Sequence, residues 1–155
     1  MAQKSRITGA KEMARVLKAL PPRVAERDLL GAVRVGAGVV KREAVKRAPK
    51  SGRGTRKVRG KDRKALQKEI KVTKIASDSK GAAVAVHTGK AFWGMFSEFG
   101  TSRQPARPWL SPALDASAVA ALGRLGKNLG DRLERTAKEL AGRYNALKKS
   151  TKRRL

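Results

Sequence analysis

The sequence predicts an α+β fold in which a small antiparallel sheet packs against an N-terminal helix pair and a long C-terminal helix. Three observations predict it: helical hydrophobic spacing before residue 48, strand-like alternation between residues 66 and 89, and a leucine-spaced segment after residue 111. The chain has 155 residues, which fits a single domain, residues 1–155, with one core. Aromatic residues make up only 4% of it, which favours helices with narrow packing faces.

Two helices are predicted at the N-terminal end. The first ends at Leu20, because the two prolines that follow stop a helix and also suit the first turn of the next one. Its apolar residues recur at helical spacing: Met13, Val16, Leu17 and Leu20. The second helix runs to about Arg47. Its apolar stripe comprises Leu29, Val33, Gly36, Val40 and Ala44. Glycines at positions 31, 36 and 38 weaken this helix by roughly 1 kcal/mol each relative to alanine, so they mark either a close backbone approach or simply a poor helix.

A basic run spans residues 48–64 and reads APKSGRGTRKVRGKDRK. It has almost nothing to bury, so we expect an exposed, mobile loop. Between Lys41 and Lys74 there are 15 basic and 3 acidic residues, nearly half of the net charge of the chain. The side chains expected to contact phosphates are Arg53, Arg56, Lys57, Arg59, Lys61, Arg63 and Lys64. Contacts to a phosphate backbone carry no base information, so this binding would be non-specific.

Two strands are predicted after this loop, over Leu66–Ala76 and Lys80–Gly89, joined by a polar turn that ends in a glycine. A two-stranded sheet alone is marginally stable, so it must pack on helices or pair with another chain. A short helix is predicted over Ala91–Phe99 and ends at the glycine that follows. Five of the six aromatic residues lie in the segment 92–109.

The last predicted helix begins near Ser111, because Pro112 suits a first helical turn. Apolar residues then keep helical spacing over many turns: Ala118, Leu122, Leu125, Leu129, Leu133, Leu140, Tyr144 and Leu147. Such a narrow stripe suits packing on a sheet or on a neighbouring subunit. Residues 148–155, KKSTKRRL, are expected to form a basic, frayed tail.

The charge of the chain restricts its partners. There are 38 Lys and Arg against 12 Asp and Glu, which gives a formal net charge of +26 and a pI near 11.6. Such a chain repels itself and needs a polyanion, an acidic partner or a crowded assembly, unless the charge only maintains solubility. Nucleic acid is the commonest polyanion, and its binding would depend on salt. The sequence has no Cys, no apolar run near the roughly 18 residues of a membrane span, and no signal-peptide core. We therefore expect no membrane partner, and a protein used inside a cell or carried out in a particle.

No constellation of catalytic or metal-binding residues is recognisable in the sequence. The single His, His87, lies in a strand pattern and the carboxylates are scattered, so we expect no enzyme, such as a nuclease, and no metal or cofactor. Glu98 lies between two Phe and before a glycine, and a carboxylate in apolar surroundings must be paired. We expect it to form a structural clasp, with Arg103 and Arg107 as candidate partners, rather than to act as a catalytic acid.

The residues from Glu98 onward have the order of a known family. Glu98-Phe99-Gly100-Thr101 is followed by Pro105-Ala106-Arg107-Pro108-Trp109-Leu110 and then by Pro112-Ala113-Leu114. This order resembles the signature of the tail-completion, or head–tail joining, family of long-tailed double-stranded DNA bacteriophages. Upstream, a helix that ends in Ala48-Pro49 and a strand at Leu66–Val72 fit the same pattern, so the resemblance covers residues 25–118. The family's threonine-glycine-leucine start to the first strand is missing, and a longer basic loop stands there.

The resemblance implies a protomer of a ring, a hexamer, at the neck between capsid portal and tail tube. It would be a structural part of the virion that is assembled in the host cytoplasm with other neck and tail proteins. Double-stranded DNA would pass through the ring, so the basic side chains would face DNA or acidic neighbours non-specifically. The residues expected to form the clasp and the subunit interface are Phe96, Glu98, Phe99, Gly100, Thr101, Arg107, Pro108, Trp109 and Leu110.

Two alternatives stay open at this point. A core role is as plausible as an interface role for Trp93 and Phe96, because aromatic residues anchor both kinds of contact. A free nucleoid-type protein that binds nucleic acid non-specifically would share the basic charge. That function leaves the order of residues from Glu98 to Leu114 unexplained.

Overall fold

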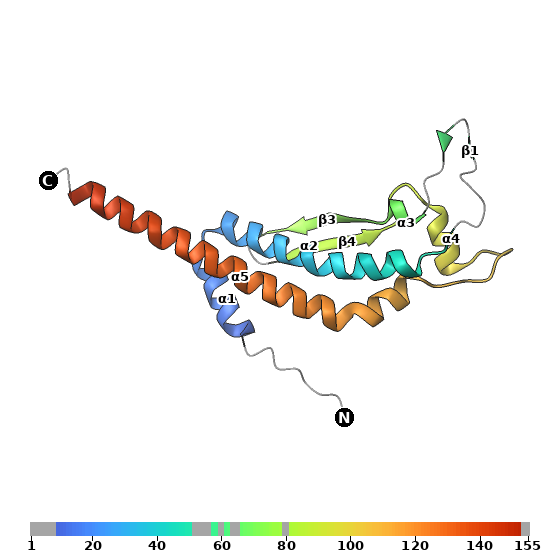
Figure 1. The fold of residues 1–155 in the computed structure, drawn as a ribbon, viewed down its shortest axis with the longest axis horizontal. Helices are drawn as coiled ribbons and strands as arrows, with labels where there is room; N and C mark the ends of the chain where they lie inside the picture. Colours follow the sequence, from blue (N-terminus) through green and yellow to red (C-terminus); the bar gives the residue numbers. More distant parts are fainter. Residues whose placement is uncertain (1–8, 51–56, 59–60, 63–65, 79–80, 153–155) are drawn as a thin grey trace, which may run out of the picture.

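The computed structural model describes residues 9–50, 57–58, 61–62, 66–78 and 81–152 (Figure 1). Its helices are α1 (Ala10–Ala19), α2 (Pro22–Arg47), α3 (Leu66–Glu69), α4 (Trp93–Phe99) and α5 (Leu110–Lys152). Its strands are β1 (Lys57–Val58), β2 (Lys61–Asp62), β3 (Lys71–Ser77) and β4 (Ala82–His87). The two strand pairs, β1 with β2 and β3 with β4, are both antiparallel. The predicted α+β class is therefore confirmed.

Helix α2 lies between the β3–β4 hairpin and the long helix α5 (Figure 1). Because both sides of α2 are covered, small residues are buried along most of its length: Ala25, Ala32, Gly36, Val40 and Ala44. The stripe predicted for α2 names the last three of these but omits the alanines at positions 25 and 32. Helix α1 lies beside the middle of α5 (Figure 1), where Met13, Leu17 and Leu20 pack against Ala32, Leu129 and Leu133. The sheet therefore packs on α2, and α1 packs mainly on α5.

The backbones of α2 and α5 approach closely at Gly36. A Cβ atom at this position would lie 3.1 Å from the Ala121 carbonyl oxygen and 3.2 Å from the Leu125 Cβ. At Gly38, by contrast, a Cβ atom would meet nothing within 4 Å. The close-approach interpretation thus applies to Gly36, whereas Gly38 only weakens the helix.

The first strand of the β3–β4 hairpin is shorter at its start than the sequence predicted. Leu66–Glu69 is a short helix, α3, and the strand begins only at Lys71. Leu66 and Ile70 are both buried in the same core cluster. Residues four apart lie on one side of a helical turn and on one face of a strand alike, so the spacing of these two residues does not distinguish the two structures. The second strand, Ala82–His87, lies inside its predicted range.

Polar contacts attach the hairpin to α2. The Lys74 Nζ lies 3.3 Å from Glu26 Oε1, and the Ser77 hydroxyl donates a hydrogen bond to the same carboxylate. These two donors, the larger effect being that of Ser77, lower the pKa of Glu26 from its ordinary value. The sheet is thus held on a helix, as the marginal stability of two strands requires.

Helix α5 is longer than predicted, because it continues through Lys152. Residues 148–152 are therefore helical and do not form the frayed tail that the sequence suggested, while residues 153–155 lie outside the described part of the chain. In the basic run, residues 57–58 and 61–62 form the small β1–β2 pair, with Lys57 opposite Asp62. Among the described helices, none is both long enough and apolar enough to cross a membrane.

Candidate assembly site at helix α4

The carboxylate of Glu98 binds the beginning of helix α5. Glu98 Oε2 accepts hydrogen bonds from the backbone N–H groups of Trp109 at 2.7 Å and Leu110 at 2.8 Å. Its Oε1 accepts from the backbone N–H of Ser111 at 2.9 Å and from the Ser111 hydroxyl at 2.7 Å. The first N–H groups of a helix have no partner within the helix, so Glu98 satisfies three of them from another element. The side chain joins α4 to α5.

These hydrogen bonds decide the ionisation of Glu98. Burial of the carboxyl disfavours the charged form and by itself raises the pKa. The backbone N–H groups of Leu110, Trp109 and Ser111 and the Ser111 hydroxyl favour the charged form and outweigh burial, so the pKa of Glu98 is lowered from its ordinary value. The charge lies at the N-terminal end of α5, where the helix dipole is positive. A general acid needs a raised pKa, so this geometry suits a structural carboxylate.

The predicted arginine partners of Glu98 are wrong. Among the described residues, neither Arg103 nor Arg107 forms an ion pair with Glu98, and both side chains are exposed. Arg107 contributes through its backbone instead, because its N–H donates to the Ser97 carbonyl at 2.8 Å. Sequence proximity suggested a charge pair, but backbone N–H groups at a helix end also stabilise a charged carboxylate through hydrogen bonds.

The turn after α4 depends on Gly100. This residue has a φ of 76°, in the left-handed region, and a Cβ atom there would lie 2.8 Å from the Ala106 nitrogen. Thr101 and Gln104 exchange backbone hydrogen bonds of 2.8 and 3.2 Å directly afterwards. A side chain at position 100 would be strained in both conformation and space, which explains the glycine in the Glu-Phe-Gly-Thr order.

Trp109 belongs to the core and not to the surface. Its side chain is 2% exposed, and its indole N–H donates to the Gly94 carbonyl at 3.4 Å. The buried residues around it are Ala44, Ala48, Leu66, Ile70, Ala91 and Ala113, with Trp93 packed against them. Leu110, which follows Trp109, is half-buried on the same cluster. The indole therefore anchors α4, α2 and the start of α5 to one another, beside the Glu98 clasp.

Helix α4 presents an apolar row to solvent. Phe92, Met95, Phe96 and Phe99 are between 45% and 77% exposed, and their spacing of i, i+3, i+4 and i+7 places them on one side of the helix. The Phe92 and Phe96 rings meet edge to face at 5.8 Å. Phe96 is thus exposed rather than in the core. The prediction named Phe96 and Phe99 but missed Phe92 and Met95, although their helical spacing is visible in the sequence.

Other predicted site residues lie apart from this row. Thr101 and Pro108 are exposed on the turn after α4. Of the seven basic residues expected to contact phosphates, Lys57 lies in β1 and Lys61 in β2, while Arg53, Arg56, Arg59, Arg63 and Lys64 lie outside the described residues. Their contact with a polyanion stays a prediction.

A polar contact between α2 and α5 was not foreseen. Asp28 is 2% exposed, and its Oδ2 accepts a hydrogen bond from the Thr136 hydroxyl at 2.7 Å. The Arg27 Nε donates to its Oδ1 at 3.2 Å. The two helices are thereby fixed in register far from α4. No pattern in the sequence predicts a contact between two residues that lie 108 positions apart.

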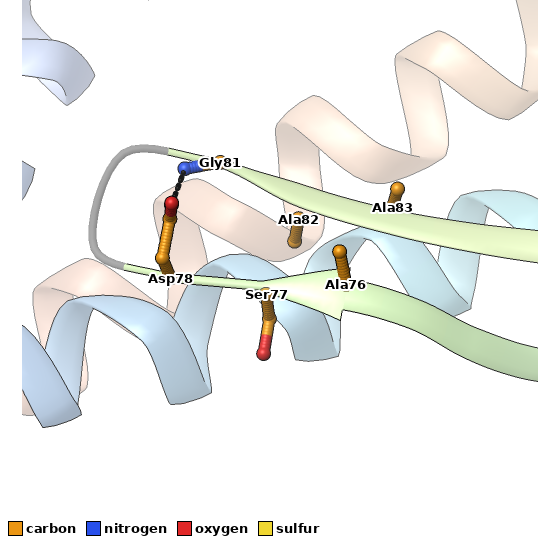
Figure 2. A pocket seen from close by; sticks show the side chains of 6 residues that line it. All are labelled: Ala76, Ser77, Asp78, Gly81, Ala82 and Ala83. Atoms are coloured by element: carbon orange, nitrogen blue, oxygen red, sulfur yellow. Dashed lines mark hydrogen bonds between the residues drawn. The ribbon is translucent and has the colours of Figure 1, made fainter.

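The remaining polar groups of the described residues serve local structure. In the part of the chain that the structure describes, no three His, Cys, Asp or Glu side chains group so that they could hold a metal. His87 Nδ1 accepts a hydrogen bond from the Gly89 N–H at 3.0 Å. A shallow pocket lies at the tip of the β3–β4 hairpin (Figure 2), lined by Ala76, Ser77, Asp78, Gly81, Ala82 and Ala83. The Asp78 carboxylate there closes the turn by accepting the Gly81 N–H at 2.6 Å, so it serves the hairpin.

The comparison with known protein families gives a match over more than half of the chain. A family model described as "Bacteriophage HK97-gp10, putative tail-component" matches residues 11–100. No curated protein and no solved structure matches the chain. The matched range holds α1 to α4 and reaches only the beginning of the Glu98–Leu114 segment on which the sequence resemblance rested.

Proposed function

Because this chain belongs to the HK97-gp10-like family of bacteriophage tail components, we propose that it is a tail-completion protein that joins head and tail in the virion. The family supports a structural role in a phage particle, and the finer placement at the neck is our proposal. The observation that carries it is the exposed apolar row of α4, Phe92, Met95, Phe96 and Phe99, on a protein with a net charge of +26. A free soluble domain gains nothing from such a row, whereas a subunit of an assembly needs one.

The proposed assembly is a homo-oligomeric ring, a hexamer, through which the genome passes. Ring closure would bring the basic side chains of several copies together, and DNA or acidic neighbouring proteins would offset their repulsion. The phosphate-contacting side chains proposed for this task are those of the basic run between Arg53 and Lys64. Assembly would take place in the host cytoplasm and end in the virion, without a membrane partner.

The protein is proposed to act without catalysis. The family is that of a structural component, and the lowered pKa of Glu98 with its four hydrogen bonds assigns this carboxylate to the fold. No cofactor is needed for such a role.

A phage lacking this gene provides the direct test. We expect such a phage to produce heads filled with DNA that do not join to tails, and wild-type particles to contain the protein at the neck, as seen by immunogold labelling. Normal tailed particles without the protein would overturn the proposal. Replacement of the seven basic residues between Arg53 and Lys64 by Gln or Ser would test the DNA contact separately, since normal infectious yield would reject it.

A nucleoid-type protein is the second candidate, and only the charge favours it. A salt titration of DNA binding separates the two functions. Tight binding of the isolated protein to DNA of any sequence near physiological salt, combined with absence from virions, would favour the nucleoid function.

A further inference from the structure

We propose that the apolar row of α4 in one copy of this chain binds the outward face of α5 around Val119 in a second copy, and that this head-to-tail contact builds the assembly. The inference deepens the proposed function, on which it rests, by naming the two surfaces that meet. The α4 surface is the row Phe92, Met95, Phe96 and Phe99. The α5 surface is the strip around Val119 and Leu122.

The α5 strip is a second exposed apolar surface. Val119 is 85% exposed and Leu122 is 59% exposed, and their spacing of three residues places them on one side of the helix. The opposite side of α5 packs on α2 through Ala113, Leu129 and Leu133, among others. Within the described residues, nine large hydrophobic side chains are exposed, and seven of these lie between Phe92 and Leu122. Exposed apolar area is thus concentrated in these two helices, as expected of an interface.

The two surfaces are complementary in the size of their side chains. The α4 row consists of bulky side chains, three Phe and one Met. The α5 strip is lined by small residues, because Ala116 and Ala120 are exposed beside Val119 and a Cβ atom at Gly123 or Gly126 would meet nothing within 4 Å. Large side chains that face small ones fill the space between two surfaces at native packing density. This favours pairing of α4 with α5 over pairing of α4 with itself.

The distribution of charge favours a second copy of this chain as the partner that binds the α4 row. The segment from Ala91 to Gly123 contains two acidic and two basic residues, so it is neutral, and the whole excess of +26 lies in the rest of the chain. Two copies of a strongly basic protein repel each other least where they meet through neutral surfaces. An acidic partner protein would find its complement on the basic surfaces instead. A contact between two different surfaces of the same chain is heterologous, and such contacts repeat to form a ring when the rotation between subunits closes.

The test uses one exposed residue on each surface. Phe99→Glu places a carboxylate in the α4 row, and Val119→Glu places one in the α5 strip. Burying an unpaired charge disfavours association, so each variant alone should associate roughly tenfold or more weakly than the wild type in sedimentation velocity at equal protein concentration. Ile75→Glu is the matched control, because Ile75 is 68% exposed on β3, outside both surfaces, and the change in net charge is the same. It should associate like the wild type.

Mixing the two variants tests which surfaces meet. Phe99→Glu keeps an intact α5 strip and Val119→Glu keeps an intact α4 row, so the mixture should form heterodimers and no larger species. If α4 met α4 instead, Val119→Glu would associate with itself like the wild type, because its α4 row is intact, and mixing it with Phe99→Glu would produce no heterodimers. Circular dichroism must show wild-type helix content for all three variants.

Three results would overturn the inference: wild-type association by either variant alone, no heterodimers on mixing, or a wild-type protein that stays monomeric at all concentrations. If the protein is found at the neck of virions, none of them would reject its proposed role in joining head and tail, although a protein that stays monomeric would count against the proposed ring. Absence from virions would reject the proposed function even if the heterodimers form.

Discussion

The substitution Glu98→Gln tests the clasp between α4 and α5 with almost no change of shape. The amide keeps one oxygen but replaces the other by an NH2 group, which faces N–H donors and cannot accept from them. If the NH2 group takes the place of Oε2, the hydrogen bonds from Trp109 and Leu110 are lost. If it takes the place of Oε1, the backbone N–H of Ser111 loses its acceptor, while the Ser111 hydroxyl can turn and accept from the amide. It also removes the negative charge at the positive end of the α5 dipole.

The loss of stability expected for Glu98→Gln can be estimated from these changes. Hydrogen bonds to a charged group contribute roughly 1.5–3 kcal/mol each, and water reaches part of the first turn of α5, where Ser111 is exposed. We therefore expect the free energy of unfolding to fall by about 2–4 kcal/mol, a large share of the roughly 5–15 kcal/mol of a typical domain. Urea unfolding followed by circular dichroism, at one fixed protein concentration and extrapolated linearly to water, measures this difference.

The effect should depend on pH in a defined direction. The pKa of Glu98 in the folded protein is lowered from the ordinary 4.5, so its ionised form stabilises the fold above pH 4.5, and this stabilisation is lost as the pH falls through the lowered folded pKa. The difference between wild type and Glu98→Gln should be full at pH 7 and shrink at acidic pH.

A carboxylate on the surface of α5, the helix that Glu98 caps, is the control for Glu98→Gln. Glu134 is exposed and pairs with Lys138 at 2.7 Å, so Glu134→Gln should leave the unfolding free energy unchanged within error. Equal stability of Glu98→Gln and wild type at pH 7, or a difference that does not vary with pH, would refute the assignment of Glu98 as the charged cap of α5.

Further predictions concern the contact between α2 and α5. Gly36→Leu should lower the unfolding free energy by roughly 1–3 kcal/mol, because α5 leaves no room for the side chain. Gly38→Ala lies in open space and should raise the unfolding free energy by about 1 kcal/mol. Equal responses of the two variants in urea unfolding would contradict the close approach at Gly36. Thr136→Val should lower the unfolding free energy by roughly 1–3 kcal/mol, since the buried Asp28 carboxylate then lacks its hydroxyl donor. The same measurement checks it, and a neutral result would mean that water replaces the hydroxyl.

The local features of the chain were predictable because neighbouring residues determine them. The two prolines at positions 21 and 22 end α1 and begin α2, and the glycine at position 100 ends α4, since these residues restrict or free the backbone wherever they occur. The helical spacing of leucines identified α5, and the order of residues from Glu98 pointed to the phage tail family that the match over residues 11–100 shows.

Errors arose where a local pattern allowed two structures. Leu66 and Ile70 fit a strand or a single helical turn equally well in a short segment, and only the cluster around Trp109 selects the turn. In the same way, Glu98 needed partners, and the sequence offered two arginines nearby. The position of the α5 N-terminus over the carboxylate, which no local spacing reveals, supplied backbone N–H groups instead.

The sequence by itself determined most of the element types, the net charge and the family, because periodicity, backbone restriction and charge are properties of the residues and their neighbours. Only the tertiary structure decided that α2 is the central helix, that Asp28 meets Thr136 across 108 residues of chain, and that the α4 row is exposed while Trp109 is buried. These outcomes depend on how elements distant in sequence pack against one another. Burial of an apolar side chain is favourable in the core and in an interface, and the packing of the whole fold determines which of the two occurs.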